Sequence, residues 1–248
     1  MKNILQKTWP LFWHHLRTCS LVAAFACFIA MSLCVSSISK GYAAETVVAN
    51  TSSLKQVMHN MQDRYDAMQS LTASFHQELR HRDSGAKQVN EGLLQWRKPL
   101  LVRWEVVGMN AELFIVEANS IWNYFPDEEL AYRYPRDLVE NSMAIINVVT
   151  GQSQLEENFS VVDEGLEQVE DGRTLARLHL YPHEPAQNFT EAILWIDIKS
   201  HLIERILIYD FYGNENDVTF SQLMPDAPVS DAAITFTPPA GTEIIDQR

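Results

Sequence analysis

The fold class is decided by the stretch Leu71-Thr72-Ala73-Ser74-Phe75-His76-Gln77-Glu78-Leu79-Arg80. Apolar or small side chains alternate there with polar ones, the period of a β-strand that buries one face. The residues that follow, 83–85, read Asp-Ser-Gly and are typical of a turn. We therefore expect this stretch to form one strand of an antiparallel sheet.

Similar runs recur on the C-terminal side at regular spacing, separated by turn signals at Gly108, Asp171-Gly172 and Tyr212-Gly213-Asn214. The pattern predicts a mainly β (α+β) fold of about eleven antiparallel strands. In addition to 71–80, we expect strands near 88–97, 101–107, 111–117, 120–125, 129–134, 158–163, 174–181, 189–197, 202–210 and 216–223.

Two segments carry a helical period instead. The first has Ser52 and Ser53 as candidate caps and an apolar, methionine-rich stripe formed by Leu54, Val57, Met58, Met61, Tyr65 and Met68. The second spans 137–150, where Leu138, Val139, Met143, Ile145, Ile146, Val148 and Val149 leave little polar surface for water. A sheet this large tends to curl or close, with helices covering an open side. The pattern leaves open whether the covered space is hollow or filled.

The N-terminal residues 1–43 have the order of a secretory signal peptide: basic residues, an apolar run over 19–35, then small residues. We expect cleavage after Ala43, with Ala44 as the alternative, and a single domain over 44–248. An uncleaved membrane anchor is the competing interpretation, because the apolar run just reaches spanning length. Lipidation at Cys27 or Cys34 fits poorly.

The bulk charge excludes some partners. All three cysteines, Cys19, Cys27 and Cys34, lie in the leader, so we expect a mature chain without disulfides. Four of the 19 Lys and Arg residues also lie there, which leaves 15 basic against 32 acidic residues, a net charge of −17. Such a surface repels nucleic acid and anionic membranes. It either keeps the protein soluble or steers it toward a basic partner.

No catalytic pattern is present. The sequence lacks a nucleophile elbow, a P-loop, a His-Glu-x-x-His motif and a dinucleotide-binding glycine motif. The pairs Glu128/Glu129 and Glu156/Glu157 are adjacent residues whose side chains diverge on a strand. The histidines after the leader fit surface or turn positions better than a metal site: His59, His76, His81, His179, His183 and His201. We therefore expect a protein that is not an enzyme and has no cofactor or metal.

One longer pattern resembles a known family. It begins with Gly92-Leu93-Leu94-Gln95-Trp96-Arg97-Lys98-Pro99-Leu100-Leu101-Val102-Arg103-Trp104, two strands separated by a basic pair and a proline. Ile121-Trp122-Asn123-Tyr124, Tyr209-Asp210-x-x-Gly213 and Phe236-Thr237-Pro238-Pro239-Ala240-Gly241 follow in order. Together these motifs resemble the periplasmic lipoprotein carrier proteins of the LolA family.

The resemblance implies an incomplete antiparallel β-barrel with a helical lid, which shields lipoprotein acyl chains in the periplasm. An inner-membrane ATP-driven lipoprotein release complex would load this monomeric carrier, and an outer-membrane receptor lipoprotein would unload it. A lipid-binding sensor, or a carrier of another acylated molecule, is the alternative. A hydrolase with an unrecognised site is a third possibility.

The resemblance also assigns site residues. Lys98, or Arg97 beside it, would hydrogen-bond lid backbone as a latch, although the family uses arginine, whose planar fork makes more bonds than lysine. Exposed cations at a strand end are the competing interpretation. Trp104 and Phe114 would line the cavity, and the inner face of the lid would be Ile145, Ile146, Val148 and Val149. Each could equally be ordinary core. A proline common near the start of the lid is missing around Met143 and Ala144.

Overall fold

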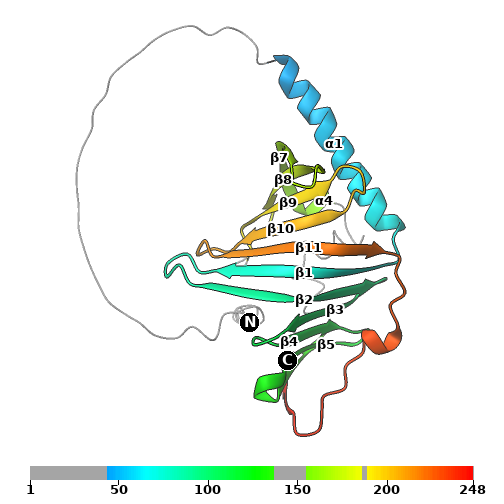
Figure 1. Cartoon of the computed structure of the whole chain (residues 1–248), viewed down its shortest axis with the longest axis vertical. Helices are drawn as coiled ribbons and strands as arrows, with labels where there is room; N and C mark the ends of the chain where they lie inside the picture. The colour runs from blue at the N-terminus through cyan, green and yellow to red at the C-terminus, as the bar shows by residue number, and fades with distance from the viewer. Residues whose placement is uncertain (1–43, 137–154, 186–188, 248) are drawn as a thin grey trace, which may run out of the picture. The chain divides into compact units, whose positions relative to one another are not determined.

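The computed structural model describes residues 44–136, 155–185 and 189–247, and most of them belong to one sheet (Figure 1). Its twelve strands follow the order β12-β6-β5-β4-β3-β2-β1-β11-β10-β9-β8-β7. Their bounds are β1 Ser70–Arg80, β2 Lys87–Arg97, β3 Leu101–Val107, β4 Glu112–Val116, β5 Ser120–Phe125, β6 Leu130–Pro135, β7 Phe159–Gln168, β8 Thr174–Pro182, β9 Glu191–Asp197, β10 Ile203–Tyr209, β11 Glu215–Pro225 and β12 Glu243–Asp246.

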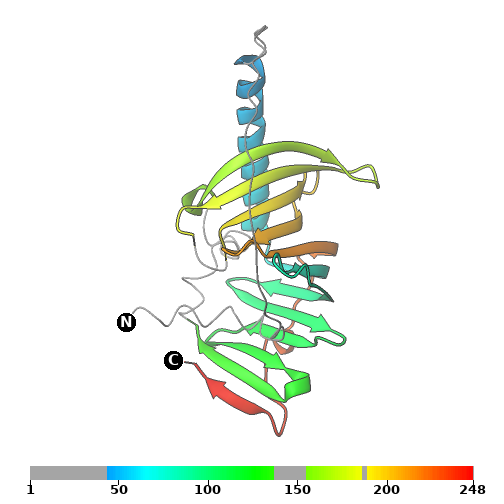
Figure 2. The same ribbon diagram turned by 90° about the vertical axis from the view of Figure 1, so that its left-hand side faces the viewer.

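The strand order follows from two meanders that meet at β1. Strands β1 to β6 run outward in chain order, and β7 to β11 run back until β11 pairs with β1. The strands fan out along the sheet, as the right-handed twist of strands requires (Figure 2). The edge strands β7 and β12 do not pair with each other, so the described sheet is open. The prediction of a mainly β fold with an unclosed sheet is confirmed.

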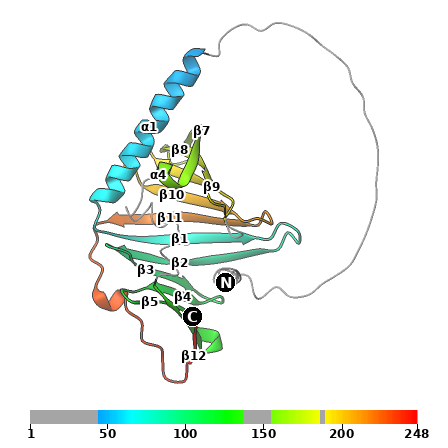
Figure 3. The ribbon, with the colours of Figure 1, turned by 180° about the vertical axis from the view of Figure 1, so that it is seen from behind.

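Two details go beyond the prediction of about eleven antiparallel strands. The sheet has twelve strands, because the short strand β12 adds to its edge (Figure 3). The pairing of β12 with β6 is parallel, whereas the other described pairings are antiparallel. A parallel pair is possible here because the long connection from β11 carries the chain back along the sheet before β12 begins.

Helix α1 spans Ala44–Ala67. Ser52 and Ser53 therefore lie within the helix rather than at its start, since no proline or glycine interrupts 44–53. The predicted apolar stripe is confirmed in its second half, where Met58, Met61, Tyr65 and Met68 are buried. The second predicted helix, 137–150, lies outside the described residues.

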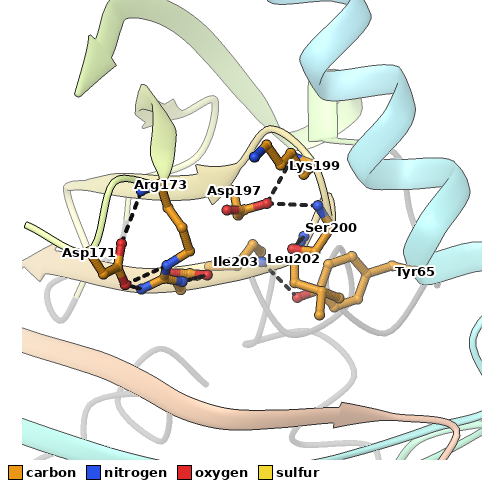
Figure 4. Close-up of polar contacts among 9 residues, drawn as sticks. Tyr65, Asp171, Arg173, Asp197, Lys199, Ser200, Leu202 and Ile203 are labelled. Carbon is orange, nitrogen blue, oxygen red and sulfur yellow. Dashed lines mark hydrogen bonds and ion pairs between the residues drawn. The ribbon is translucent and has the colours of Figure 1, made fainter. Parts of the chain in front are cut away.

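Tyr65 anchors α1 to the start of β10. Its hydroxyl accepts a hydrogen bond from the backbone N–H of Ile203 at 3.2 Å (Figure 4). Burial raises the pKa of Tyr65 to about 12, although this hydrogen bond opposes the shift. The preceding turn is fixed by Asp197, whose carboxylate accepts from the N–H groups of Lys199 and Ser200 at 2.8 and 2.7 Å.

The strand register divides the side chains into two faces. We call one the Trp104 face; it carries Phe75, Trp104, Phe114 and, in the other half of the sheet, Leu194. We call the other the Trp195 face. This assignment uses the alternation of side chains along each strand and the matching orientation of paired residues.

The C-terminal segment 226–242 packs on the Trp195 face of the strands β3 to β5. The Phe236 ring lies 5.6 Å from that of Trp122 and 5.1 Å from that of Tyr124, and its N–H donates to Glu117 at 2.5 Å. The segment contains the 3-10 helix η3, Asp231–Ala233. Two other short helices are η2, Pro126–Glu128, and α4, Leu155–Asn158. This part of the Trp195 face is therefore covered by the chain itself.

Candidate functional site

An aromatic cluster lies on the Trp104 face where β1, β3 and β11 are close in the sheet. The Trp104 ring stacks on Phe75 with centroids 3.8 Å apart, and Phe220 meets it edge-on at 6.3 Å. Phe114 is the register partner of Trp104 on β4, so the two expected cavity residues lie side by side on one face. Both remain half-buried, whereas Phe75 is buried. The cluster thus leaves apolar aromatic surface incompletely covered.

Gly92 explains how the cluster can form. It is the register partner of Phe75, and a Cβ atom at this position would lie 2.5 Å from the Phe75 ring. The same Cβ would lie 1.9 Å from the backbone oxygen of Glu105. No side chain fits there, because ordinary contacts between carbon atoms are about 3.5–4.0 Å. The glycine of the Gly-x-Leu motif therefore lets the Phe75 ring lie flat across β2.

Within the described residues, five buried polar atoms on the Trp104 face have no hydrogen-bond partner. They are Nε1 of Trp96 and Trp104, Oε1 of Glu112, Oδ1 of Asn123 and Oη of Tyr134. All belong to β2–β6, and the register places them on the face that carries Trp104. Buried polar side-chain atoms normally have hydrogen-bond partners, so five such atoms without partners make the strands β2–β6 unusual.

Among these five residues, Glu112 is the one whose charge changes near neutral pH. Burial raises its pKa to about 7, and a hydrogen bond from the Asn123 side chain offsets part of that rise. Burial likewise raises the pKa of Tyr134 to about 12. Near neutral pH, a large fraction of the Glu112 carboxyl groups is therefore protonated and can donate a hydrogen bond.

Sequence reasoning singled out Trp104 and Phe114 but not Glu112, Asn123 or Tyr134. One signal was available for two of them. Glu112 precedes the apolar run Leu-Phe-Ile-Val and starts an otherwise apolar strand. Asn123 interrupts the apolar Ile-Trp-Asn-Tyr motif. Whether their polar atoms find partners depends on neighbouring strands, which alternation alone does not reveal.

Lys98 and Arg97, the expected latch residues, contact different parts of the molecule. Lys98 Nζ donates to the backbone oxygen of Asp66 at 2.5 Å, and its N–H donates to Gln69 at 2.9 Å. Lys98 thus ties the β2–β3 turn to the end of α1. Its expected partner, the backbone of 137–150, lies outside the described residues.

Arg97 points to the Trp195 face. Its guanidinium donates to the backbone oxygen of Val229 at 2.8 Å and to Asp231 at 2.5 Å. It also lines an open pocket of about 450 Å³ between the end of β2 and the segment 226–233. Arg97 is therefore on the opposite face from Trp104 and Phe114. The remaining expected residues, Ile145, Ile146, Val148 and Val149, lie outside the described residues.

The Trp195 face of β8–β10 holds a paired polar cluster. The indole N–H of Trp195 donates to Glu167 at 2.8 Å, and the guanidinium of Arg205 lies 4.2 Å above its ring. Arg205 in turn forms two hydrogen bonds with Asp217, at 2.8 and 2.6 Å. Beside it, His179 lies 2.9 Å from both Glu164 and Glu191. This cluster leaves few groups free to bind a ligand.

Two other kinds of feature are absent from the described part of the chain. No group of three or more His, Cys, Asp or Glu side chains there could hold a metal ion. No described helix is both long enough and apolar enough to cross a bilayer.

Comparison with known proteins identifies the family. Residues 66–237 match the family model of the outer membrane lipoprotein carrier protein LolA. The outer-membrane lipoprotein carrier protein of Dechloromonas aromatica is 23% identical over 72% of this chain and 82% of its own length. That of Chromobacterium violaceum is 22% identical over 86% of this chain and 95% of its own length.

Among solved structures, an uncharacterized conserved protein of Thermus thermophilus shares the fold, with a TM-score of 0.52 at 12% identity over 78% of this chain and 99% of that protein. The family model covers well over half of this chain, including the aromatic cluster and the Lys98 turn. As the sequence predicted, the chain is a member of a carrier family and not an enzyme: it belongs to the LolA family.

Proposed function

We propose that this protein carries lipoproteins through the periplasm. It would accept them from an inner-membrane ATP-driven release complex and deliver them to an outer-membrane receptor lipoprotein. The family match and the carrier names of its relatives support this role. The expected signal peptide supports the location, and the acidic mature chain makes direct adhesion to anionic membranes unfavourable.

The energetics of the cargo explain why a carrier is needed. A triacylated anchor has on the order of 40 methylene groups, and each costs about 0.8 kcal/mol when exposed to water. Exposure of the acyl chains to water during free diffusion would therefore cost roughly 30 kcal/mol. A carrier must cover most of this surface and still release it, so its binding face should be apolar but incompletely packed.

The half-buried pair Trp104 and Phe114 carries the proposal. The two residues lie on adjacent strands of one face, next to the half-buried Leu94 and Phe220. A core formed for stability alone would bury such side chains fully. Aromatic and aliphatic surface left partly uncovered supplies contacts for an acyl chain.

Depletion of the protein in its host tests the role. Outer-membrane lipoproteins should then accumulate at the inner membrane, as measured by fractionation and immunoblotting. Normal sorting after depletion would rule the carrier role out. Mass spectrometry of molecules that co-purify with the protein would separate a lipoprotein carrier from a sensor or a carrier of another acylated molecule.

The latch is a second part of the proposal. Lys98 joins the β2–β3 turn to the end of α1 through Asp66, so its loss should loosen the closed, empty carrier. We expect Lys98→Leu to load lipoprotein normally and to transfer it at least tenfold more slowly to the receptor. Lys199→Leu, at an exposed lysine in the β9–β10 turn, is the matched control. Unchanged transfer by Lys98→Leu would refute the latch.

A further inference from the structure

Three side chains on neighbouring strands of the Trp104 face have polar atoms that an entirely apolar carrier would not use. They are Trp104, Glu112 and Asn123, on β3, β4 and β5. Glu112 and Asn123 are 8% and 5% exposed, so nine-tenths or more of each is buried. Nε1 of Trp104, Oε1 of Glu112 and Oδ1 of Asn123 are all buried and have no hydrogen-bond partner among the residues that the structure describes.

These three residues form one compact group. Trp104 pairs with Phe114, and Phe114 pairs with Asn123, so Trp104 and Asn123 flank the same ring. Glu112 lies two residues before Phe114 on β4 and therefore points to the same face. Asn123 is close enough to Glu112 for its side chain to lower the pKa of that carboxyl group. A ligand lying across Phe114 would thus meet all three polar groups.

The unpaired atoms call for a partner. A buried donor or acceptor has lost its water and gained nothing in return, which is why such atoms are rare in native proteins. Here the indole N–H can only donate, and the amide oxygen can only accept. The group therefore suits a ligand that has both an acceptor and a donor close together.

We propose that Trp104, Glu112 and Asn123 form a polar subsite that binds the neutral ester or amide group, with its neighbouring hydroxyl or N–H, at the head of an acyl chain. This inference rests on the proposed function, because it assumes that acyl chains bind the Trp104 face. The indole N–H would donate to the carbonyl oxygen. The Asn123 oxygen, together with the Glu112 carboxyl group, would accept from the hydroxyl or N–H.

Charge makes this subsite selective. An anionic head, such as a fatty-acid carboxylate or a phosphate, would lie beside a buried carboxyl group with which it would have to compete for protons. The raised pKa of Glu112, about 7, shows that the site already disfavours one negative charge. A second one would be disfavoured more strongly, whereas a neutral ester or amide meets no such repulsion.

Equilibrium dialysis of the purified protein against radiolabelled monomyristoylglycerol and against myristate, at pH 7.5, tests the proposal. The two probes share a chain length and differ in the head group. We expect the wild-type protein to bind monomyristoylglycerol at least tenfold more tightly. Asn123→Leu and Glu112→Leu should each reduce this preference severalfold. Trp104→Phe, which keeps an aromatic ring and removes the N–H, should also reduce it.

Thr72→Val is the matched control. Thr72 Oγ1 is also buried without a partner, but Thr72 lies on the Trp195 face. Its replacement should leave the preference unchanged. Retained myristate binding by each variant shows that the variant is folded, so a loss of preference cannot be attributed to unfolding.

The outcomes separate the two proposals. Failure of the wild-type protein to bind either probe would overturn the proposed function together with the subsite. Equal binding of both probes would overturn the subsite alone and leave the carrier role intact. A preference that survives all three variants, or that Thr72→Val lowers equally, would show that these residues do not form the subsite.

Discussion

The two halves of the Trp104 face are built differently. In β8 and β9, the face is aliphatic and sealed: Leu178, Leu180, Leu194 and Ile196 are at most 1% exposed. In β2–β6, the same face carries half-buried aromatic residues and five unpaired polar atoms. One sheet therefore combines a closely packed half with a half whose packing and hydrogen bonding are incomplete.

The two tryptophans show what this difference means. The indole N–H of Trp195 donates a hydrogen bond, and two arginine guanidinium groups lie over its ring. Both the N–H and the ring face of Trp195 therefore have partners within the protein. Trp104 stacks on Phe75, but its N–H has no partner in the described part of the chain. Satisfied groups stabilise the fold, whereas buried unsatisfied groups persist where a function retains them. The aliphatic half thus supports the structure, and the aromatic half is the binding candidate.

The largest effect on stability is expected from a substitution that creates a cavity in the aliphatic half. Leu194→Ala should destabilise the protein by about 3 kcal/mol, because a sealed core cannot collapse around the lost methyl groups. Leu94→Ala, at a half-buried position in the aromatic half, should cost about 1 kcal/mol. Urea unfolding followed by circular dichroism measures both. Equal losses would show that the two halves are packed alike.

Glu112→Gln gives the next largest effect, and its size depends on pH. The folded-state pKa of Glu112, about 7, is above its ordinary value of 4.5. The wild-type protein therefore loses stability as pH rises from the unfolded-state pKa through the folded-state pKa, whereas glutamine does not titrate. From pH 5 to pH 8, the variant should gain about 2 kcal/mol relative to wild type.

Urea unfolding of both proteins across this pH range measures the difference. Glu204→Gln is a useful comparison in the other half of the sheet. Burial also raises the pKa of Glu204, but the ion pair with Arg173 opposes that rise. A pH-independent difference between Glu112→Gln and wild type would show that Glu112 is not a buried, unsatisfied acid.

The sequence predicts the strands of both halves well, because they either alternate apolar and polar residues or, like β4 and β9, are short apolar runs. Strand β12 was missed for a physical reason. Its residues Glu-Ile-Ile-Asp are few, and Glu243, Ile244 and Asp246 are exposed, so no buried face imposes a period. The pairing of β1 with β11 joins residues more than a hundred positions apart, which no local pattern specifies.

The site is only partly visible in the sequence. The family resemblance singled out Trp104 and Phe114, and the strand register makes them neighbours on one face. Alternation along β2 also predicts that Arg97 and Trp96 lie on opposite faces of the sheet, since adjacent residues of a strand point to opposite faces. Glu112 and Asn123 stand out in the sequence as polar residues in apolar strands. Their lack of hydrogen-bond partners could not be predicted, because it depends on the side chains of neighbouring strands.

Tyr65→Phe tests how firmly α1 is attached to the sealed half. The hydroxyl of Tyr65 is the acceptor for the buried N–H of Ile203. Its removal should leave that N–H unpaired and cost about 1.5 kcal/mol of unfolding free energy. Tyr124→Phe, at a half-buried tyrosine on the Trp195 face, is the control and should change stability by less than about 0.5 kcal/mol. A comparable loss in both would mean that the Ile203 contact adds no stability.

The smallest expected effect compares the two tryptophans directly. Trp195→Phe and Trp104→Phe remove the same ring area and the same N–H group, so most of the apolar loss cancels between them. Trp195→Phe also leaves Glu167 without its hydrogen bond, whereas Trp104→Phe removes a donor that has no partner. Trp195→Phe should therefore be the more destabilising by about 1 kcal/mol in urea unfolding without ligand. With saturating monomyristoylglycerol the difference should shrink, because bound ligand gives the Trp104 N–H a partner that phenylalanine lacks. A difference that lipid leaves unchanged would mean that the indole N–H of Trp104 contributes nothing to binding.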